Sequence, residues 1–213
     1  MARRLLKPSP IAADVPLFTP DDLLAGKRPA AKTVLIYDDD HYYMGGVLAE
    51  LLAREGFAVS IAFPTGDVSR WMVMTMEQHQ VAARLLEVGV KMVPHRVLAS
   101  AARGTAELRC VFSGKTEEVA ADAIVLVTAR LPNDALAKGL HMRKADWADA
   151  GIKSVAAIGD AYTPGTIAAA VFWGRKAAED FETSRPQDDP PFRREVTGLA
   201  DVDVGGFLER LGR

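Results

Sequence analysis

The sequence has 213 residues, of which 49% are hydrophobic and 25% charged, and its formal net charge is −2. This is the balance of an ordinary globular protein, and such a small net charge gives no global attraction to nucleic acid or to an anionic membrane. One cysteine, Cys110, excludes an intrachain disulfide and a cysteine-based metal site. The apolar runs are shorter than the roughly 20 residues that span a bilayer. Because the first residues also lack the apolar run of a secretory signal, we expect a cytoplasmic protein.

Residues 1–31 are predicted to form an extended N-terminal arm. Five prolines fall within this stretch, and proline blocks both helices and sheet ladders. Pro20-Asp21-Asp22 is the exception, since proline and acidic residues favour the first turn of a helix.

Residues 32–130 are predicted to form a Rossmann-like domain of the NAD(P)-binding type. Residues 33–37 and 58–63 are short apolar runs typical of buried parallel strands. A helix between them, ending near Arg54 with Gly56 as its stop, completes a right-handed βαβ unit. A second helix is predicted to begin near Thr75, where Thr75 and Gln78 have the spacing of a capping box, and a third strand follows at 90–93.

The pattern changes after this third strand. Residues 96–101, 107–112 and 115–119 are short segments separated by turn signals, which predicts an antiparallel β-meander. An apolar strand follows at 124–128. The predicted fold class is therefore α/β, with a three-layer Rossmann-like domain that carries a meander.

Residues 131–183 are expected to be part of a second nucleotide-binding domain. They include a predicted strand at 155–158, Gly159-Asp160, and a helix over about 166–182 that is rich in small residues. The proline-rich and acidic stretch beyond it predicts a C-terminal arm over 184–213.

Three motifs together resemble a known family. The segment from Val34 to Gly46, with Asp38-Asp39-Asp40, resembles the start of the second nucleotide-like domain in trimethylamine and dimethylamine dehydrogenases. Val127-Thr128-Ala129-Arg130-Leu131-Pro132-Asn133 resembles the return strand of the wider glutathione-reductase-like family, and Ile158-Gly159-Asp160-Ala161 resembles the closing strand of its FAD domain. The resemblance covers about residues 15–200.

In that family an N-terminal barrel holds FMN and an iron–sulfur cluster, and an FAD-like domain is interrupted by an NAD-like domain. The resemblance thus implies that FMN, the cluster and the opening part of the FAD-like domain would lie outside this sequence. They would be supplied by a separate polypeptide, or the sequence would be a piece of a larger gene product.

The resemblance also implies the candidate cofactor-binding residues. Asp160 would bind the hydroxyls of FAD or ADP, and the helix behind it would direct its N–H groups toward the ligand. The other candidates are Gly159, Ala161, Ile167, Thr128, Ala129 and Gly45. A role for Asp160 as the cap of the following helix would equally explain an acid at that position. Ala129 replaces the usual family glycine, which opposes close approach of the backbone to a ligand there.

NAD(P) binding in the ordinary mode is not favoured. The fingerprint needs two glycines so that the backbone can approach the pyrophosphate, but the loop here reads Asp-Asp-Asp-His-Tyr-Tyr-Met-Gly-Gly. Gly45 would remain as the glycine that packs the helix. We interpret Asp38–Asp40 as a solvated or helix-capping loop. The alternative, the acidic site of a phospho-receiver domain, would need an acceptor aspartate at the end of the third strand, where Val93-Pro94-His95 stands.

The resemblance implies a C-terminal part or small subunit of a flavin-dependent oxidoreductase, acting on amines, N-methylated compounds or enoyl substrates. It would complete an ADP or FAD pocket. The sequence offers no candidate catalytic residue and no candidate metal-binding residue. The partner would be a larger flavoprotein polypeptide or a second copy. The alternative is a stand-alone nucleotide-binding protein or a purely structural subunit without catalysis.

Overall fold

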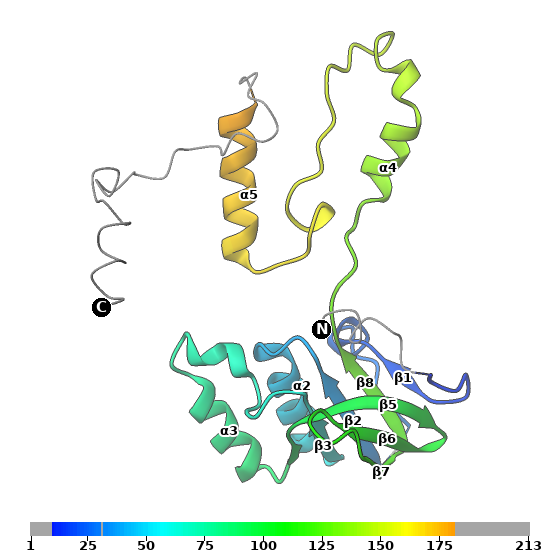
Figure 1. Ribbon diagram of the computed structural model, residues 1–213, viewed down its shortest axis with the longest axis vertical. Helices are drawn as coiled ribbons and strands as arrows, with labels where there is room; N and C mark the ends of the chain where they lie inside the picture. The colour runs from blue at the N-terminus through cyan, green and yellow to red at the C-terminus, as the bar shows by residue number, and fades with distance from the viewer. Residues whose placement is uncertain (1–9, 31, 182–213) are drawn as a thin grey trace, which may run out of the picture. The chain divides into compact units, whose positions relative to one another are not determined.

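The computed structural model describes residues 10–30 and 32–181 (Figure 1). The chain divides into two compact units, Met1–Ala129 and Arg130–Arg213. Among the helices in these described ranges, none combines the length and the apolar character needed to cross a membrane.

The first unit is built on a five-stranded sheet in which every strand pair is parallel. Its strands are β1 (Leu17–Phe18), β2 (Thr33–Asp38), β3 (Ala58–Ala62), β4 (Lys91–Val93) and β8 (Ala123–Val127), in the order β1-β8-β2-β3-β4. Strand β2 therefore lies at the centre, with its carboxyl end beside the carboxyl end of β8. The predicted strands at 33–37, 58–63, 90–93 and 124–128 are all present.

Helices cover one face of this sheet and a β-meander covers the other (Figure 1). The helical layer holds α2 (Tyr43–Arg54), α3 (Gln78–Glu87) and the short 3₁₀ helix η2 (Arg70–Val73). The meander is an antiparallel sheet of β5 (Arg96–Ala102), β6 (Gly104–Cys110) and β7 (Thr116–Ala121). The predicted α/β fold class with three layers and a meander is thus confirmed.

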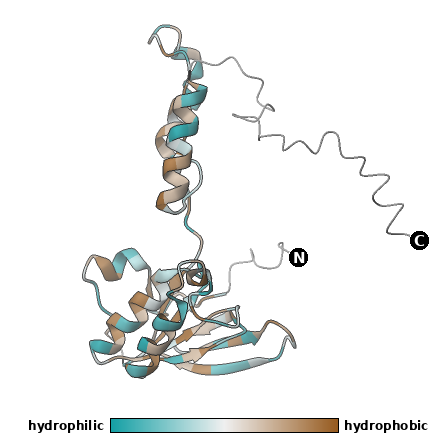
Figure 2. Ribbon diagram, turned by 90° about the vertical axis from the view of Figure 1, so that its left-hand side faces the viewer, coloured by the Kyte–Doolittle hydropathy of each residue, from teal (hydrophilic) through white to brown (hydrophobic). Residues whose placement is uncertain are grey.

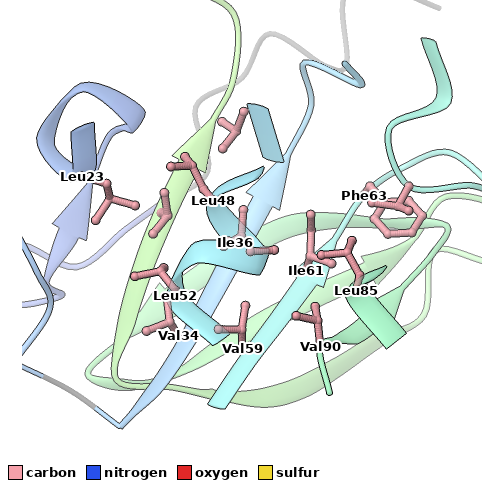
Figure 3. Close-up of a cluster of buried hydrophobic side chains, with 14 residues drawn as sticks. Leu23, Val34, Ile36, Leu48, Leu52, Val59, Ile61, Phe63, Leu85 and Val90 are labelled. Atoms are coloured by element: carbon pink, nitrogen blue, oxygen red, sulfur yellow. The ribbon is translucent and has the colours of Figure 1, made fainter. Parts of the chain in front are cut away.

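Alternation along β2 assigns its side chains to the two layers. Val34 and Ile36 belong to the cluster that packs under the helices, where Figure 3 shows them among Leu48, Leu52 and Leu85. Leu35 and Tyr37 belong to the cluster under the meander. Since successive side chains of a strand point to opposite faces, Asp38 is directed to the helical side, as Ile36 is.

The N-terminal residues are more ordered than the predicted extended arm. Leu17–Phe18 adds β1 to the sheet beside β8, and α1 (Pro20–Leu24) places Leu23 in the core with 1% of its surface exposed. The predicted helical turn at Pro20 is confirmed, with Thr19 and Asp22 forming a capping box. The prolines stop longer elements here, but the apolar residues between them still pack on the sheet.

The second helix begins later than predicted, because the expected capping box at Thr75 does not form. Helix α3 starts at Gln78, and its N-cap Glu77 makes no side-chain cap. The Thr75 hydroxyl donates instead to the Met72 carbonyl and to Glu77, while the Gln78 amide donates to the Val68 carbonyl.

The second unit contains α4 (Ala135–Met142), η3 (Lys144–Asp146), η4 (Gly159–Ala161) and α5 (Ile167–Asp180). The helix predicted over about 166–182 is present as α5, whereas α4 was not anticipated. The strand predicted at 155–158 is absent, and residues 130–181 contain no strand. A strand forms only when a neighbour accepts its hydrogen bonds, and the described part of this unit offers none. The predicted C-terminal arm, 184–213, lies outside the described residues.

Candidate functional site

The carboxyl end of β2 carries the first group of candidate residues. In a doubly wound sheet, ligands bind outside the carboxyl ends of the strands at the point where the strand order reverses. Here β8 and β3 flank β2, and the Asp39 N–H donates to the Val127 carbonyl at 2.8 Å. The candidates Thr128 and Ala129, which follow β8, therefore lie at the same edge as the loop between β2 and α2.

Asp38 is buried at this edge, although the sequence suggested a solvated or helix-capping loop. Its side chain has no exposed surface, and its Oδ1 accepts the N–H groups of Asp40 and His41, each at 3.1 Å. Helix α2 has Tyr42 as its N-cap, without a side-chain cap. The interpretation is wrong for Asp38 because alternation along β2 directs this side chain under α2 and away from solvent.

Gly45 lies directly against Asp38. A Cβ on Gly45 would overlap Oδ2 of Asp38 and would stand 2.6 Å from its Cγ. On the neighbouring Gly46, a Cβ would stand 2.9 Å from Val81 Cγ1. The pair of glycines therefore lets the first turn of α2 sit close to β2 and α3, which agrees with the packing role predicted for Gly45. Its predicted cofactor role stays a prediction.

The electrostatics of this loop are set by burial. Burial raises the pKa of Asp38 to about 6, against the smaller lowering effect of the His41 N–H and charge. The pKa of His41 is also raised, chiefly by its interaction with Asp39, whose Oδ1 lies 3.5 Å from His41 Nε2. His41 adopts a left-handed backbone with φ of 61°. Neither the half-buried position of His41 nor the buried position of Ser69 was expected from the sequence.

This arrangement does not fit a dinucleotide in the ordinary mode. A pyrophosphate would bind at the N-terminus of α2. The carboxylate of Asp38 already lies against the first turn of that helix. A phospho-receiver site would need an acceptor aspartate at the end of the third strand, β4, which is instead followed by Pro94 and His95.

The second group of candidates forms a turn in the second unit. The 3₁₀ turn η4 consists of Gly159, Asp160 and Ala161. Gly159 has a φ of 57°, a left-handed conformation that favours glycine. The Asn133 N–H donates to the Asp160 carbonyl at 3.0 Å. Two motifs that lie apart in the sequence, Leu131-Pro132-Asn133 and Gly159-Asp160, therefore meet in this unit.

Asp160 does not cap the following helix. The N-cap of α5 is Thr166, whose hydroxyl accepts the Ala169 N–H, and Ile167 is the first residue of the helix with 84% of its surface exposed. Asp160 Oδ1 instead accepts the Gly165 N–H at 3.3 Å, and the residue is exposed. A helix-capping role therefore does not explain the acid at position 160, and the role of Asp160 in binding a nucleotide stays a prediction.

The first unit matches a known family of α/β domains. Residues 18–123 match the family model described as "OYE-like second alpha/beta domain". The chain is 31% identical over 197 residues to dimethylamine dehydrogenase of Hyphomicrobium sp. (strain x), covering 84% of this chain and 27% of that protein.

Two solved structures extend the match through both units. Histamine dehydrogenase from Rhizobium sp. 4-9 is 42% identical with a TM-score of 0.87, over 93% of this chain and 31% of that one. The 6-hydroxypseudooxynicotine amine oxidase from Pseudomonas geniculata N1 is 36% identical with a TM-score of 0.75, over 84% of this chain and 26% of that one. The chain is therefore homologous to a region of the dimethylamine and histamine dehydrogenase family, the region that includes the OYE-like second alpha/beta domain. It spans about a quarter to a third of the length of these relatives.

Proposed function

We propose that this chain is the nucleotide-fold part, as a C-terminal portion or a small subunit, of a flavin-dependent oxidoreductase that acts on amines or N-methylated compounds. It completes an ADP- or FAD-binding pocket, and the chemistry takes place on polypeptide outside this sequence. The observation that carries the proposal is the 42% identical match to histamine dehydrogenase, which runs over 93% of this chain and only 31% of that protein. The family's enoyl reductases are a less favoured model, because the relatives above 30% identity carry the names of amine enzymes.

Asp160 is the residue proposed to hold the nucleotide. Its carboxylate is exposed on the η4 turn, and the cap of α5 is supplied by Thr166, so the helix does not need Asp160. A carboxylate at such a turn accepts hydrogen bonds from ribose or ribityl hydroxyls. Gly159 supports this role because its left-handed backbone shapes the turn, while Ala161 and Ile167 would line the approach.

The second unit supports the need for a partner polypeptide. No side chain in residues 130–181 is buried, yet α5 has no charged residue between Ile167 and Gly174. Figure 2 shows this first part of α5 largely in the brown of apolar residues. A helical stretch that is apolar on all sides is normally enclosed by protein. The proposed partner is a larger flavoprotein polypeptide that encloses α5, and a second copy of this chain is the alternative.

Calorimetric titration of the purified chain with ADP, FAD and NADH tests the nucleotide site, after an absorbance scan for co-purified flavin. The proposal expects binding of ADP or FAD that Asp160→Ala abolishes. The matched control is Asp149→Ala, which removes an exposed carboxylate in the same unit. Binding that survives Asp160→Ala would refute the assignment of Asp160. If no nucleotide binds to the chain or to its complex with the partner, the alternative of a purely structural subunit is correct.

A further inference from the structure

The loops around the first turn of α2 hold buried polar atoms that have no hydrogen-bond partner. Among the described residues these atoms are Asp38 Oδ2, His41 Nδ1 and Ser69 Oγ. Asp38 has no exposed surface and Ser69 has 1%. Asp38 lies against Gly45, and Ser69 Oγ is 3.1 Å from the position of a Cβ on Gly46. Unsatisfied buried groups are rare in folded proteins, so their gathering at one helix terminus indicates a site whose charge state matters.

Few charged groups face Asp38. Its own loop supplies Asp39, Asp40 and His41, and His41 is the cation that favours ionisation of Asp38 while Asp40 opposes it. Helix α2 has no acidic residue in its first turn and no basic residue before its last turn. On β8, the uncharged Val127 pairs with Asp38 in the sheet register. Near η2, Arg70 and Asp67 form an ion pair with each other at 2.8 Å.

A chain of hydrogen bonds links the Asp38 carboxylate, through the backbone of His41, to the η2 segment. Asp38 Oδ1 holds the N–H groups of Asp40 and His41, and the His41 carbonyl accepts the Trp71 N–H at 2.8 Å. His41 and Ser69 both have left-handed backbones, with φ of 61° and 50°. Such conformations persist in non-glycine residues only where surrounding contacts hold them. The Trp71 side chain is 57% exposed, and the hydrogen bond from its N–H to the His41 carbonyl joins η2 to the β2–α2 loop.

We propose that Asp38 and His41 form a proton-dependent latch that orders the β2–α2 loop and, through the His41 carbonyl, the start of η2. With protons on both groups, the Asp38 carboxyl is neutral in its buried site and His41 is a cation beside Asp39. As the protons leave, an uncompensated carboxylate lies against Gly45, and the loop opens more often. The latch is a property of the first unit and does not depend on the proposed function.

The two groups act in the same direction. Burial raises the pKa of Asp38 from its usual value to about 6. The stability that the protonated carboxyl gives to the folded state is therefore fully present below pH 4 and is lost as pH rises through about 6. The pKa of His41 is also raised, so the stability that protonated His41 gives to the folded state is lost as pH rises through that raised pKa. Order of the loop and of η2 therefore decreases from acidic toward mildly alkaline pH.

Amide hydrogen exchange of Trp71 in the full chain, corrected for the intrinsic pH dependence of exchange, tests the latch. Protection is expected to fall by at least about tenfold between pH 5 and pH 8, because the Asp38 pKa of about 6 lies one unit above pH 5 and each pKa unit corresponds to a factor of ten. Asp38→Asn is expected to remove most of this fall, because asparagine keeps an acceptor but does not titrate. His41→Asn, which tolerates a positive φ, is expected to remove the remainder. Glu87→Gln is the control, because Glu87 is an exposed carboxylate on α3 that is not among the groups acting on Asp38 or His41.

Equal protection at both pH values in the unaltered chain would overturn the latch, as would an Asp38→Asn variant that keeps the full pH dependence. If Asp38→Asn does not fold, the carboxyl carbon of Asp38 is titrated by NMR in the unaltered chain. A midpoint near pH 6 that coincides with the loss of Trp71 protection supports the latch. A midpoint near pH 4 overturns it.

Discussion

Gly45 lies directly over the carboxylate of Asp38, so closely that a Cβ on Gly45 would overlap Oδ2. Asp38 is the last residue of the central strand β2, and Gly45 lies in the first turn of α2, which begins at Tyr43. In dinucleotide-binding folds a glycine at this helix allows close packing of helix and strand, while other glycines admit a phosphate. Here the packing role is kept and a buried acid takes the space beside the helix, where its charge opposes a pyrophosphate.

Gly45→Ala is expected to destabilise the chain by about 1–3 kcal/mol, the usual cost of overpacking, because the new methyl group must displace Asp38. Urea denaturation measures the loss. Gly139→Ala is the control: Gly139 lies in α4 with nothing within 4 Å of its Cβ position, so alanine should be neutral or slightly stabilising. Equal effects of the two substitutions would contradict the close contact at Gly45.

Two neighbouring leucines on α3 separate core packing from helix propensity. Leu85 is 1% exposed and belongs to the core under the sheet, whereas Leu86 is 64% exposed. Leu85→Ala is expected to lower the free energy of unfolding by about 2–5 kcal/mol, and Leu86→Ala by less than about 0.5 kcal/mol. A comparable loss from both variants in denaturant unfolding would show that α3 does not pack as described.

The stability of the Asp38→Asn variant relative to the unaltered chain should depend on pH. Ionisation of Asp38 in the folded state is disfavoured by burial, so the unaltered chain loses stability as pH rises from about 4 to above 6. The variant lacks this loss, and the difference in unfolding free energy should therefore shift in its favour by about 1.4 kcal/mol between pH 5 and pH 8, the equivalent of one pKa unit. A difference that is constant across this range would contradict the raised pKa.

Removal of the cap of α5 should be separable from removal of the candidate ligand-binding carboxylate. Thr166→Ala deletes the side chain that accepts the Ala169 N–H and should destabilise the start of α5 by about 1 kcal/mol. Asp160→Ala should leave the helix intact, since the Asp160 carboxylate accepts the loop N–H of Gly165 and not an N–H of α5. Amide exchange across the first turn of α5 distinguishes them, and a loss of protection in Asp160→Ala would restore a capping role for that residue.

The sequence predicts most of the first unit. Buried parallel strands carry a strong local signal, because runs such as Val34–Ile36 are apolar and rich in β-branched residues and are bounded by turn residues. The burial of Asp38 was missed because three consecutive acids suggest a solvated loop. Alternation from Ile36 gives the correct direction, but only once the strand is known to continue through residue 38.

The second unit is less predictable for a physical reason. A strand at 155–158 is indicated by its apolar residues, but its formation depends on neighbouring strands that the described part of the chain does not contain. Helix α4 was missed because Gly139 interrupts its pattern and Pro132 precedes it closely. The role of Asp160 cannot be read from sequence alone, since a cap and a ligand-binding acid have the same residue type at the same spacing.

The proposed role of this chain is to complete a nucleotide pocket together with a larger flavoprotein polypeptide. The most direct test is to co-express it with the part of Rhizobium sp. 4-9 histamine dehydrogenase that lies outside the matched region, and to titrate the purified complex with ADP. The account predicts a stable complex that binds ADP, with binding lost in Asp160→Ala and kept in Asp149→Ala. A complex that binds ADP equally with and without Asp160, or a chain that stays monomeric and does not associate, would contradict it.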